Sequence, residues 1–474
     1  MKKVGIIGAG PAGLACGVML AKKGIAVDIY DNDTSVGGLS KSFALWEQRV
    51  DLGPHRFFST DPRVNRIWSY FVGNNYVMVD RLTRIYYGRK FFFYPVKAFN
   101  ALKNLGVLTA GECVLSYLHA LVKPKGREKN FEEWVSDKFG YKLYSIFFKT
   151  YSERLWGIPC TELDADFARQ RIKGLNLSEV IRDAFFGGGA KRHKTLLDRF
   201  AYPQNGAGEP YENMAKYIEE HGGRIHLSSR VKGIQTEDKR VTGIELENGT
   251  IEKMDYIVST APFTEMLMSV PELGEESRKI ASELSYRNTT LVYLRIKDRN
   301  LFRDNWLYIH ENSVQVGRIT NFSNWSPYTK KGSKDTILAL EYWSYDDDIL
   351  WKMKDEELIA LARKDLIQTG LVKKNTIGEG YVVRLHKSYP VYGLGYREKL
   401  SKLQKAAEQL ENICFIGRNG SFKYNNQDHS LLMGMMAAKN ILAGRKLYDL
   451  WKVNTDGEYQ EKARQTMKSR RSGS

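Results

Sequence analysis

The stretch KVGIIGAGPAGLACGVMLAKK, residues 3–23, decides the fold of this 474-residue chain. It starts with a short β-type run, Lys3–Ile7, continues through Gly8, Gly10 and Gly13, and ends in a helical pattern. Strand, glycine-rich turn and helix in this order are the context that the dinucleotide-binding fingerprint GxGxxG requires. The first glycine permits the tight turn, the second lets the backbone approach a pyrophosphate, and the third allows close packing of helix on strand. We therefore predict a nucleotide-binding sheet whose first helix points its N-terminus at phosphate.

The residues after this helix indicate which dinucleotide is bound. A second strand, Ile25–Tyr30, ends in Asp31, where a carboxylate accepts ribose hydroxyls. The pair Gly37 and Gly38 follows six residues after Asp31. This arrangement resembles the extended fingerprint of flavoproteins related to amine oxidases, in which the glycine pair contacts the phosphate and ribose of FAD. The resemblance implies FAD as the cofactor.

The charge of the chain points to anionic partners. Lys and Arg number 72 against 55 Asp and Glu, a net charge of +17. Part of the excess lies in solvated runs, Lys123–Lys129 and Lys191–Lys194, and in the tail 451–474. Phosphorylated small molecules, an acidic membrane face and nucleic acid all fit this charge, which alone does not choose among them. Among these we expect a phosphorylated small molecule as partner, and no nucleic acid. A peripheral membrane contact through the basic tail and a homodimer are further expectations.

Cysteine usage and hydropathy favour a cytoplasmic protein without a metal site. The four cysteines are far apart and have no metal-ligand or redox-pair spacing. The N-terminus has the lysines and apolar run of a signal peptide, but the glycine fingerprint interrupts it. We find no uninterrupted apolar run of about 18 residues that would span a membrane.

The remaining residues predict an α/β protein with interleaved lobes that share one interior. An FAD-binding Rossmann-type domain of the GR2-like class is interrupted by a helical lobe and by a substrate lobe of mixed or antiparallel sheet. Strand patterns such as Tyr256–Ser259 and Ile413–Ile416 return the chain to the first sheet. The expected parts are the FAD domain at 1–62, 198–262 and 402–450, the helical insertion at 63–197, the substrate lobe at 263–401 and the basic tail at 451–474.

Five segments resemble the UDP-galactopyranose mutase family. They occur in the family's order and cover nearly the whole chain. They are LGPHRFF (52–58), YSERLWGIP (151–159), VGRITNF (316–322), SYPVYG (388–393) and GRNGSFKYNNQDHS (417–430).

The resemblance implies a role for particular residues. His55 would lie beside the flavin and Arg418 next to it, and Arg318 and Tyr424 would bind the diphosphate of the substrate. We place His55, Arg318 and Tyr424 in the catalytic machinery. The further cofactor contacts expected from the last segment are Asp428, His429 and Ser430. The further substrate contacts are Trp156 near the nucleobase, Tyr389 at the sugar, and Asn425 and Asn426. Asp428 or an adjacent asparagine is expected to cap a helix that starts near His429, with its amides facing the flavin.

The family's chemistry implies a pyranose/furanose isomerase that acts on a nucleotide sugar, a nucleotide-diphosphate hexose, for cell-surface polysaccharide biosynthesis. Reduced flavin attacks the anomeric carbon through N5, the nucleoside diphosphate leaves, and the ring opens and recloses while the sugar is held as an N5-glycosyl adduct. The protein then has to place positive charge on the leaving diphosphate and align the anomeric carbon over the flavin.

Several positions have a structural alternative. His55 could be a hydrogen-bonded loop histidine, and Trp156 and Tyr389 could be core aromatics. Arg318 follows Val314 and Val316 in an alternating pattern whose inward phase would include it. An inward arginine needs a partner, either a ligand phosphate or a glutamate, because burying an unpaired charge costs several kcal/mol.

The chain also departs from the family pattern. Phe58 stands where the mutases have a second histidine, and Asn426 stands where they have an acidic residue. Leu175 stands at the second phosphate arginine, a charge that Lys173, Arg171 or Arg182 could supply from nearby. These departures predict a sister group with another substrate.

Two other classes of protein remain open. One is an FAD-dependent oxidoreductase of the amine oxidase or protoporphyrinogen oxidase type, acting on a glycan or lipid-linked precursor. The other is a non-catalytic flavin-binding or membrane-surface protein that acts through its basic tail. Apolar substrates favour an apolar pocket, whereas Arg318, Tyr424 and Asp428 favour a phosphorylated polar one.

Overall fold

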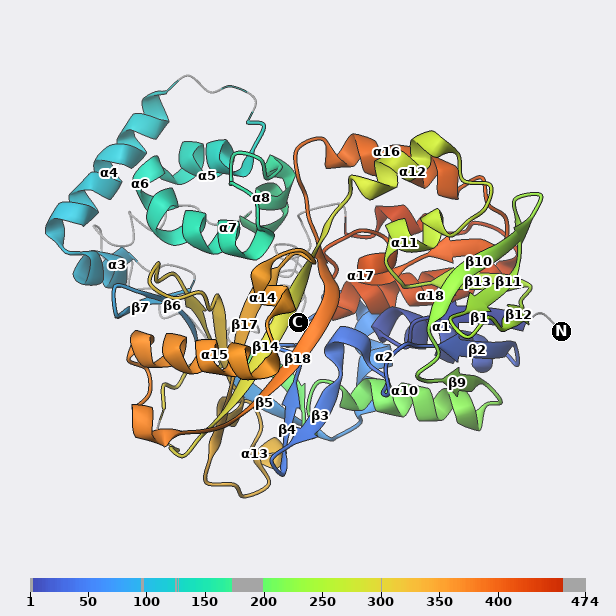
Figure 1. Ribbon diagram of the computed structural model, residues 1–474, viewed down its shortest axis with the longest axis horizontal. Coiled ribbons are helices and arrows are strands. Elements are labelled where there is room, and N and C mark those ends of the chain that lie inside the picture. Colours follow the sequence, from blue (N-terminus) through green and yellow to red (C-terminus); the bar gives the residue numbers. More distant parts are fainter. Residues whose placement is uncertain are drawn as a thin grey trace, which may run out of the picture.

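The predicted nucleotide-binding sheet is present, and the glycine-rich turn follows its central strand, β1 (Lys3–Ile7). The computed structural model describes residues 3–94, 98–123, 126, 128–172, 199–299 and 301–454. Five parallel strands form this sheet in the order β19-β13-β1-β2-β9 (Figure 1). The α/β class with a Rossmann-type sheet is therefore confirmed. The strands are β1 Lys3–Ile7, β2 Ala26–Tyr30, β9 Arg224–His226, β13 Tyr256–Ser259 and β19 Ile413–Phe415.

Helices from both ends of the chain cover this sheet. Helix α1 (Pro11–Ala21) and helix α18 (Gln427–Ala443) pack so closely that a Cβ atom on Gly434 would lie 2.2 Å from the carbonyl oxygen of Ala12. Helices that are far apart in the sequence therefore pack directly against each other in one domain. Helices α2 (Pro62–Val72) and α10 (Glu209–Glu220) complete the same apolar core.

A second sheet, here named the substrate sheet after the substrate lobe predicted for this part of the chain, lies in the centre of Figure 1. Its seven strands have the order β18-β14-β17-β16-β15-β6-β7, and all pairs are antiparallel except β15 with β6. Helix α15 (Asp355–Thr369) packs on one face through an aliphatic core. The strands are β6 Thr83–Tyr87, β7 Lys90–Phe93, β14 Tyr286–Ile296, β15 Trp306–Ile309, β16 Arg318–Asn321, β17 Thr336–Ser344 and β18 Ile377–Pro390.

The helical lobe lies at the upper left of Figure 1 and starts later than the expected 63–197. Residues 76–93 form strands instead, because aromatic and β-branched residues flank a turn at Gly88 and Arg89, both of which have positive φ. Two of these strands, β6 and β7, join the substrate sheet. The lobe consists of α3 Ala98–Leu105, α4 Val107–Val122, α5 Phe131–Phe139, α6 Tyr141–Tyr144, a π-helical turn at Ser145–Lys149, α7 Thr150–Trp156 and α8 Ala165–Ile172.

Smaller elements surround the two sheets. A three-stranded β-ribbon turns at Asn248 and Gly249, and β9, which precedes it, pairs with β2 in the nucleotide-binding sheet rather than with this ribbon. The ribbon is β10 Val231–Glu237, β11 Arg240–Leu246 and β12 Ile251–Lys253, and the two-stranded sheets are β3 Ser42–Leu45 with β4 Gln48–Asp51 and β5 Tyr76–Asp80 with β8 Arg199–Pro203. The remaining α-helices are α11 Phe263–Met268, α12 Glu275–Ser282, α13 Pro327–Lys330, α14 Ile349–Lys352, α16 Tyr396–Ala407 and α17 Gly417–Gly420. Among the described residues, no helix has the length and apolar character needed to cross a bilayer.

Candidate functional site

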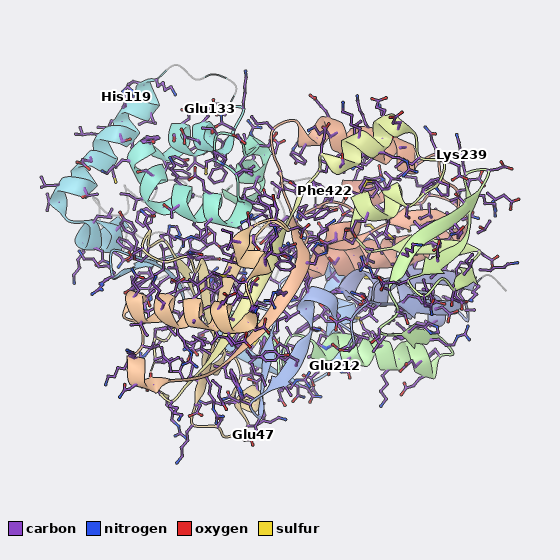
Figure 2. The ribbon with its side chains drawn as sticks, viewed as in Figure 1. Glu47, His119, Glu133, Glu212, Lys239 and Phe422 are labelled. Carbon is purple, nitrogen blue, oxygen red and sulfur yellow. The ribbon has the colours of Figure 1, made fainter. Side chains whose placement is uncertain are left out.

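A single large cavity joins the nucleotide-binding sheet to the substrate sheet. Its volume is about 1400 Å³, which exceeds the roughly 300–1,000 Å³ of ordinary ligand pockets. Gly8, Gly10 and Asp31 line one end, and Trp156 and Arg318 line the other. Figure 2 shows Phe422 near the middle of the molecule, and this fully buried side chain lies in the loop 417–430 that lines the cavity between its ends. The cavity therefore has room for a dinucleotide and a second ligand.

The glycine fingerprint has the geometry of a phosphate cradle. Gly8 has φ +104°, and a Cβ atom on Gly13 would lie 2.0 Å from the carbonyl oxygen of Gly8, so a side chain at Gly13 would push helix and strand apart. Helix α1 begins after Gly10 without a side-chain cap. Its N-terminal amides are thereby left for a ligand phosphate.

Asp31 and the glycine pair complete this end of the cavity. The Asp31 carboxylate accepts hydrogen bonds from the backbone amides of Ala9 (2.6 Å) and Asp33 (2.8 Å), and burial raises its pKa. Gly37 and Gly38 have positive φ, and a Cβ atom on Gly38 would lie 3.1 Å from the Cα atom of Gly10. The two glycine loops thus pack against each other with no side chain between them. These residues fit the adenosine and pyrophosphate of FAD.

His55 lines the cavity within the electrostatic reach of two arginines. Its ring Nδ1 is buried without a hydrogen-bond partner among the described residues, so it is not the hydrogen-bonded loop histidine of the structural alternative. Burial and the charges of Arg318 and Arg418 lower the pKa of His55 to about 3. The ring is therefore neutral at physiological pH and presents a nitrogen to whatever occupies the cavity.

Arg318 faces the cavity, and its partner is a glutamate. Register places Tyr308, Arg318 and Glu341 side by side on neighbouring strands and on one face of the sheet. The guanidinium Nε lies 2.6 Å from Oε1 of Glu341, and Nη2 bonds the other carboxylate oxygen. The prediction that an inward Arg318 needs a partner is confirmed, and the partner is the glutamate of the two alternatives. The predicted strand is too long, because β16 begins only at Arg318, and Val314 and Val316 pack in the core with α15.

Arg418 lies over two tyrosines. The rings of Tyr389 and Tyr424 stack at 5.5 Å and 21°, and the Arg418 guanidinium carbon lies 4.4 Å and 4.3 Å from their centroids. Its Nε donates to the carbonyl of Ser388 at 2.7 Å, and Nη1 donates to that of Asn425 at 3.3 Å. Arg418 is thus held rigidly, with its charge at the centre of the site.

Trp156 lines the cavity but lies mostly in the core. It is 1% exposed and packs against Phe167 at 4.5 Å, with Tyr389, Tyr392 and Tyr424 within about 6 Å. Its Nε1 has no hydrogen-bond partner among the described residues. The packing alternative therefore accounts for most of this side chain, and Nε1 is the one polar group that it offers.

The segment 417–430 contains residues that stabilise the fold and residues that line the cavity. Asn425 is buried, and its amide bonds the carbonyl of Gly417 (3.2 Å) and the side chain of Asn454 (2.9 Å), so this side chain is occupied inside the protein. Asn426 is the adjacent asparagine that caps α18, which begins at Gln427, two residues before the expected start. Asp428, His429 and Ser430 follow in its first turn and line the cavity.

Some of the sequence expectations lie outside the described residues. No side chain is described for Arg171, Lys173, Leu175 or Arg182, and the same holds for Lys191–Lys194 and for the tail from residue 455. Phe58, by contrast, lines the cavity.

Sequence reasoning missed five residues that line the cavity or hold its arginines. Glu341 could have been recognised from the sequence, because it is the only charged residue in the mostly apolar strand TILALEYWS. The others had no such signal, since only the fold brings them together. They are Arg56, Arg81, Tyr308 and His310.

Comparison with known proteins agrees with the flavin-binding cradle described above. The profile of the family described as flavin containing amine oxidoreductase matches residues 11–442. The probable UDP-galactopyranose mutase of Klebsiella pneumoniae is 23% identical over 459 residues, covering 93% of this chain and 95% of that protein. The 4,4'-diaponeurosporene oxygenase of Staphylococcus aureus is 24% identical over 470 residues, covering 88% of this chain and 93% of that protein.

Solved structures share the fold. Reduced UDP-galactopyranose mutase has a TM-score of 0.85 at 22% identity, covering 97% of each chain. Putrescine oxidase bound to putrescine has a TM-score of 0.63 at 15% identity, covering 93% of this chain and 99% of the other. The predicted resemblance to the mutases is thereby confirmed. Because the family profile spans nearly all of the described sequence, the chain belongs to the flavin-containing amine oxidoreductase family.

Proposed function

We propose that the protein is a cytoplasmic FAD-dependent isomerase, which interconverts the pyranose and furanose forms of a nucleotide-diphosphate hexose for cell-surface polysaccharide. One observation carries this proposal: beyond the nucleotide cradle the cavity continues into a chamber of stacked tyrosines and arginines around a neutral histidine. A chamber of this kind suits a flat, polar, anionic ligand.

The arginines are arranged to receive a diphosphate. Arg318 shares its charge with Glu341, and its Nη2 lies 3.4 Å from the hydroxyl of Tyr389. Arg418 uses two of its donors on backbone carbonyls and keeps its charge over the rings of Tyr389 and Tyr424. In this proposal Arg318 and Tyr424 hold the leaving diphosphate, and developing negative charge there is stabilised by groups already in place.

His55 and Arg418 orient the cofactor in the same proposal. Bound FAD, in its reduced form, supplies the nucleophile that displaces the diphosphate. A neutral His55 can accept or donate one hydrogen bond at the ring system without adding charge, and the surrounding aromatic side chains exclude water.

A net oxidoreductase is the second candidate, because the family name and the Staphylococcus aureus relative both describe redox chemistry. The two functions separate in one experiment. Holoprotein is incubated with nucleotide-linked hexopyranoses after chemical reduction of its flavin, and in parallel with amines and a porphyrinogen under oxygen. The proposal predicts a furanose product in the first reaction and no oxygen uptake in the second. Oxygen uptake together with an absence of isomerisation would replace it with the oxidoreductase.

A further inference from the structure

Two of the six arginines that line the cavity have no partner among the described residues. Four are accounted for: Arg318 pairs with Glu341, Arg384 with Asp355, Arg230 with Glu247, and Arg418 bonds backbone carbonyls. Arg56 and Arg81 have neither an ion pair nor a side-chain hydrogen bond in the described part of the chain.

These two arginines act on each other. Burial, and after it the charge of Arg81, lowers the pKa of Arg56 to about 10, so Arg56 is still a cation at neutral pH. Its Nη1 is buried without a partner, and its guanidinium carbon lies 5.8 Å from the ring of Phe58, too far for more than a weak cation–π contact. Neighbouring guanidiniums without an anion destabilise a protein, because each is desolvated and repelled by the other.

The pair lines the same cavity as the proposed diphosphate position but is influenced by other charged groups. Arg318 and Arg418 are the charges that act on His55, whereas the groups that act on Arg56 are Arg81, Tyr308, Tyr94 and Asp428. Tyr94 and Tyr308 meet edge to face at 5.2 Å and line the cavity beside the arginines. Trp156 and most of its aromatic neighbours line the same cavity. In the proposed function a nucleobase would stack on them, and the sugar of the same ligand would reach Arg56 and Arg81.

We propose that Arg56 and Arg81 bind a carboxylate on the sugar, so that the substrate is a nucleotide-diphosphate hexuronate. This inference rests on the proposed function and names its substrate class. A guanidinium fork matches a carboxylate bidentately, and tyrosine rings beside it provide apolar surface for a sugar ring. Among the groups that act on Arg56, only Asp428 carries a negative charge, and it forms no ion pair with either arginine among the described residues. The two guanidiniums therefore carry positive charge that a carboxylate of the ligand would neutralise. A neutral hexose would leave that charge buried and unpaired.

Binding to the oxidised holoprotein tests this inference without any turnover. Calorimetry compares UDP, UDP-galactose, UDP-glucose, UDP-galacturonate and UDP-glucuronate, and the same series carrying thymidine. We expect one hexuronate to bind about tenfold more tightly than its neutral counterpart, the size of one charge-assisted contact.

Substitutions then show which residues cause the preference for a hexuronate. Arg81→Gln should weaken hexuronate binding about tenfold and leave neutral sugars within about twofold. Arg56→Lys should recover only part of the preference that Arg56→Gln loses, because an ammonium keeps the charge but not the fork. Arg66→Gln, an exposed arginine of α2 outside the cavity lining, is the matched control and should change nothing.

The possible failures are distinguishable. Tight binding of UDP or its thymidine counterpart without any gain from the carboxylate overturns the hexuronate inference and leaves the proposed function standing. Binding by none of the nucleotides overturns both. Loss of flavin from Arg81→Gln, seen in the visible absorption spectrum, would assign the arginines to the cofactor and also overturn the inference.

Discussion

Arg318 and Glu341 form a bidentate ion pair across strands β16 and β17, with Nε 2.6 Å from Oε1, and Arg318 lines the cavity. Glu341 is 1% exposed and Arg318 is 14% exposed. The carboxylate therefore keeps a cation inside the protein and, by sharing its charge, sets how strongly that cation attracts a phosphate.

Glu341→Gln should lower the free energy of unfolding by about 3 kcal/mol, because the arginine loses its counter-charge inside the protein. UDP should then raise the melting temperature more in the variant than in the unmodified protein, since the ligand phosphate replaces the lost carboxylate. Thermal denaturation with and without UDP measures both effects. Glu411→Gln removes the partner of Arg240 in an exposed pair and should cost less than about 1 kcal/mol. An equal UDP effect in all three proteins would contradict this role of Arg318.

Gly13→Ala should abolish flavin binding or folding, because its methyl group would lie 2.0 Å from the carbonyl oxygen of Gly8, and neither backbone can move freely. Gly111→Ala is the control. Gly111 lies in α4 with open space around its Cβ position, and the substitution should stabilise the helix by about 0.5–1 kcal/mol. Flavin absorbance per mole of purified protein is the measurement. Full flavin content in Gly13→Ala would contradict the cradle.

Acid should destabilise the protein through buried neutral histidines. Burial lowers the pKa of His310 to about 3, whereas an unfolded histidine titrates near 6.5. The unfolded state binds the extra proton between these values, so stability falls as the pH decreases from about 6.5 toward 3, by about 1.4 kcal/mol per pH unit for each such group. His310→Gln should make this slope shallower, whatever it does to absolute stability. An unchanged slope in chemical denaturation would show that His310 titrates normally in the folded protein.

Substitutions of the neighbouring residues Asn425 and Tyr424 should have different effects, the first on stability and the second on ligand binding. Asn425→Ala should lower the free energy of unfolding by about 1–3 kcal/mol, because the carbonyl of Gly417 loses a donor in a buried loop. Tyr424→Phe keeps the ring stacked on Tyr389 and removes only the hydroxyl. It should therefore reduce UDP affinity and turnover while the melting temperature stays the same. A melting temperature that falls further in Tyr424→Phe than in Asn425→Ala would reverse this assignment.

The nucleotide-binding half of the fold was predictable because its signals are local. Gly8, Gly10, Gly13 and Asp31 lie within one strand, turn, helix and strand, so their spacing specifies the cradle before any long-range contact is considered. The same holds for the cap of α18, which involves only Asn426 and the turn that follows it.

The arrangement of side chains at the substrate end of the cavity could not be predicted from local sequence patterns. Arg318 pairs with Glu341, which lies on another strand. Arg81, which lies between β5 and β6, lines the same cavity as Arg56 only because of the fold. Alternation from Val314 and Val316 correctly indicated an inward arginine but not where its strand starts, because β16 begins only at Arg318. Patterns within a segment do not encode such pairings across the sheet.

The ratio of furanose to pyranose, followed by NMR with reduced and with oxidised holoprotein, tests the central claim most directly. The substrates are the matched neutral and hexuronate nucleotide sugars. The proposed function predicts that one of them equilibrates only when the flavin is reduced, without net consumption of reductant. No conversion of any nucleotide sugar by the reduced, flavin-loaded protein, or conversion that consumes reductant in step with product, would contradict it.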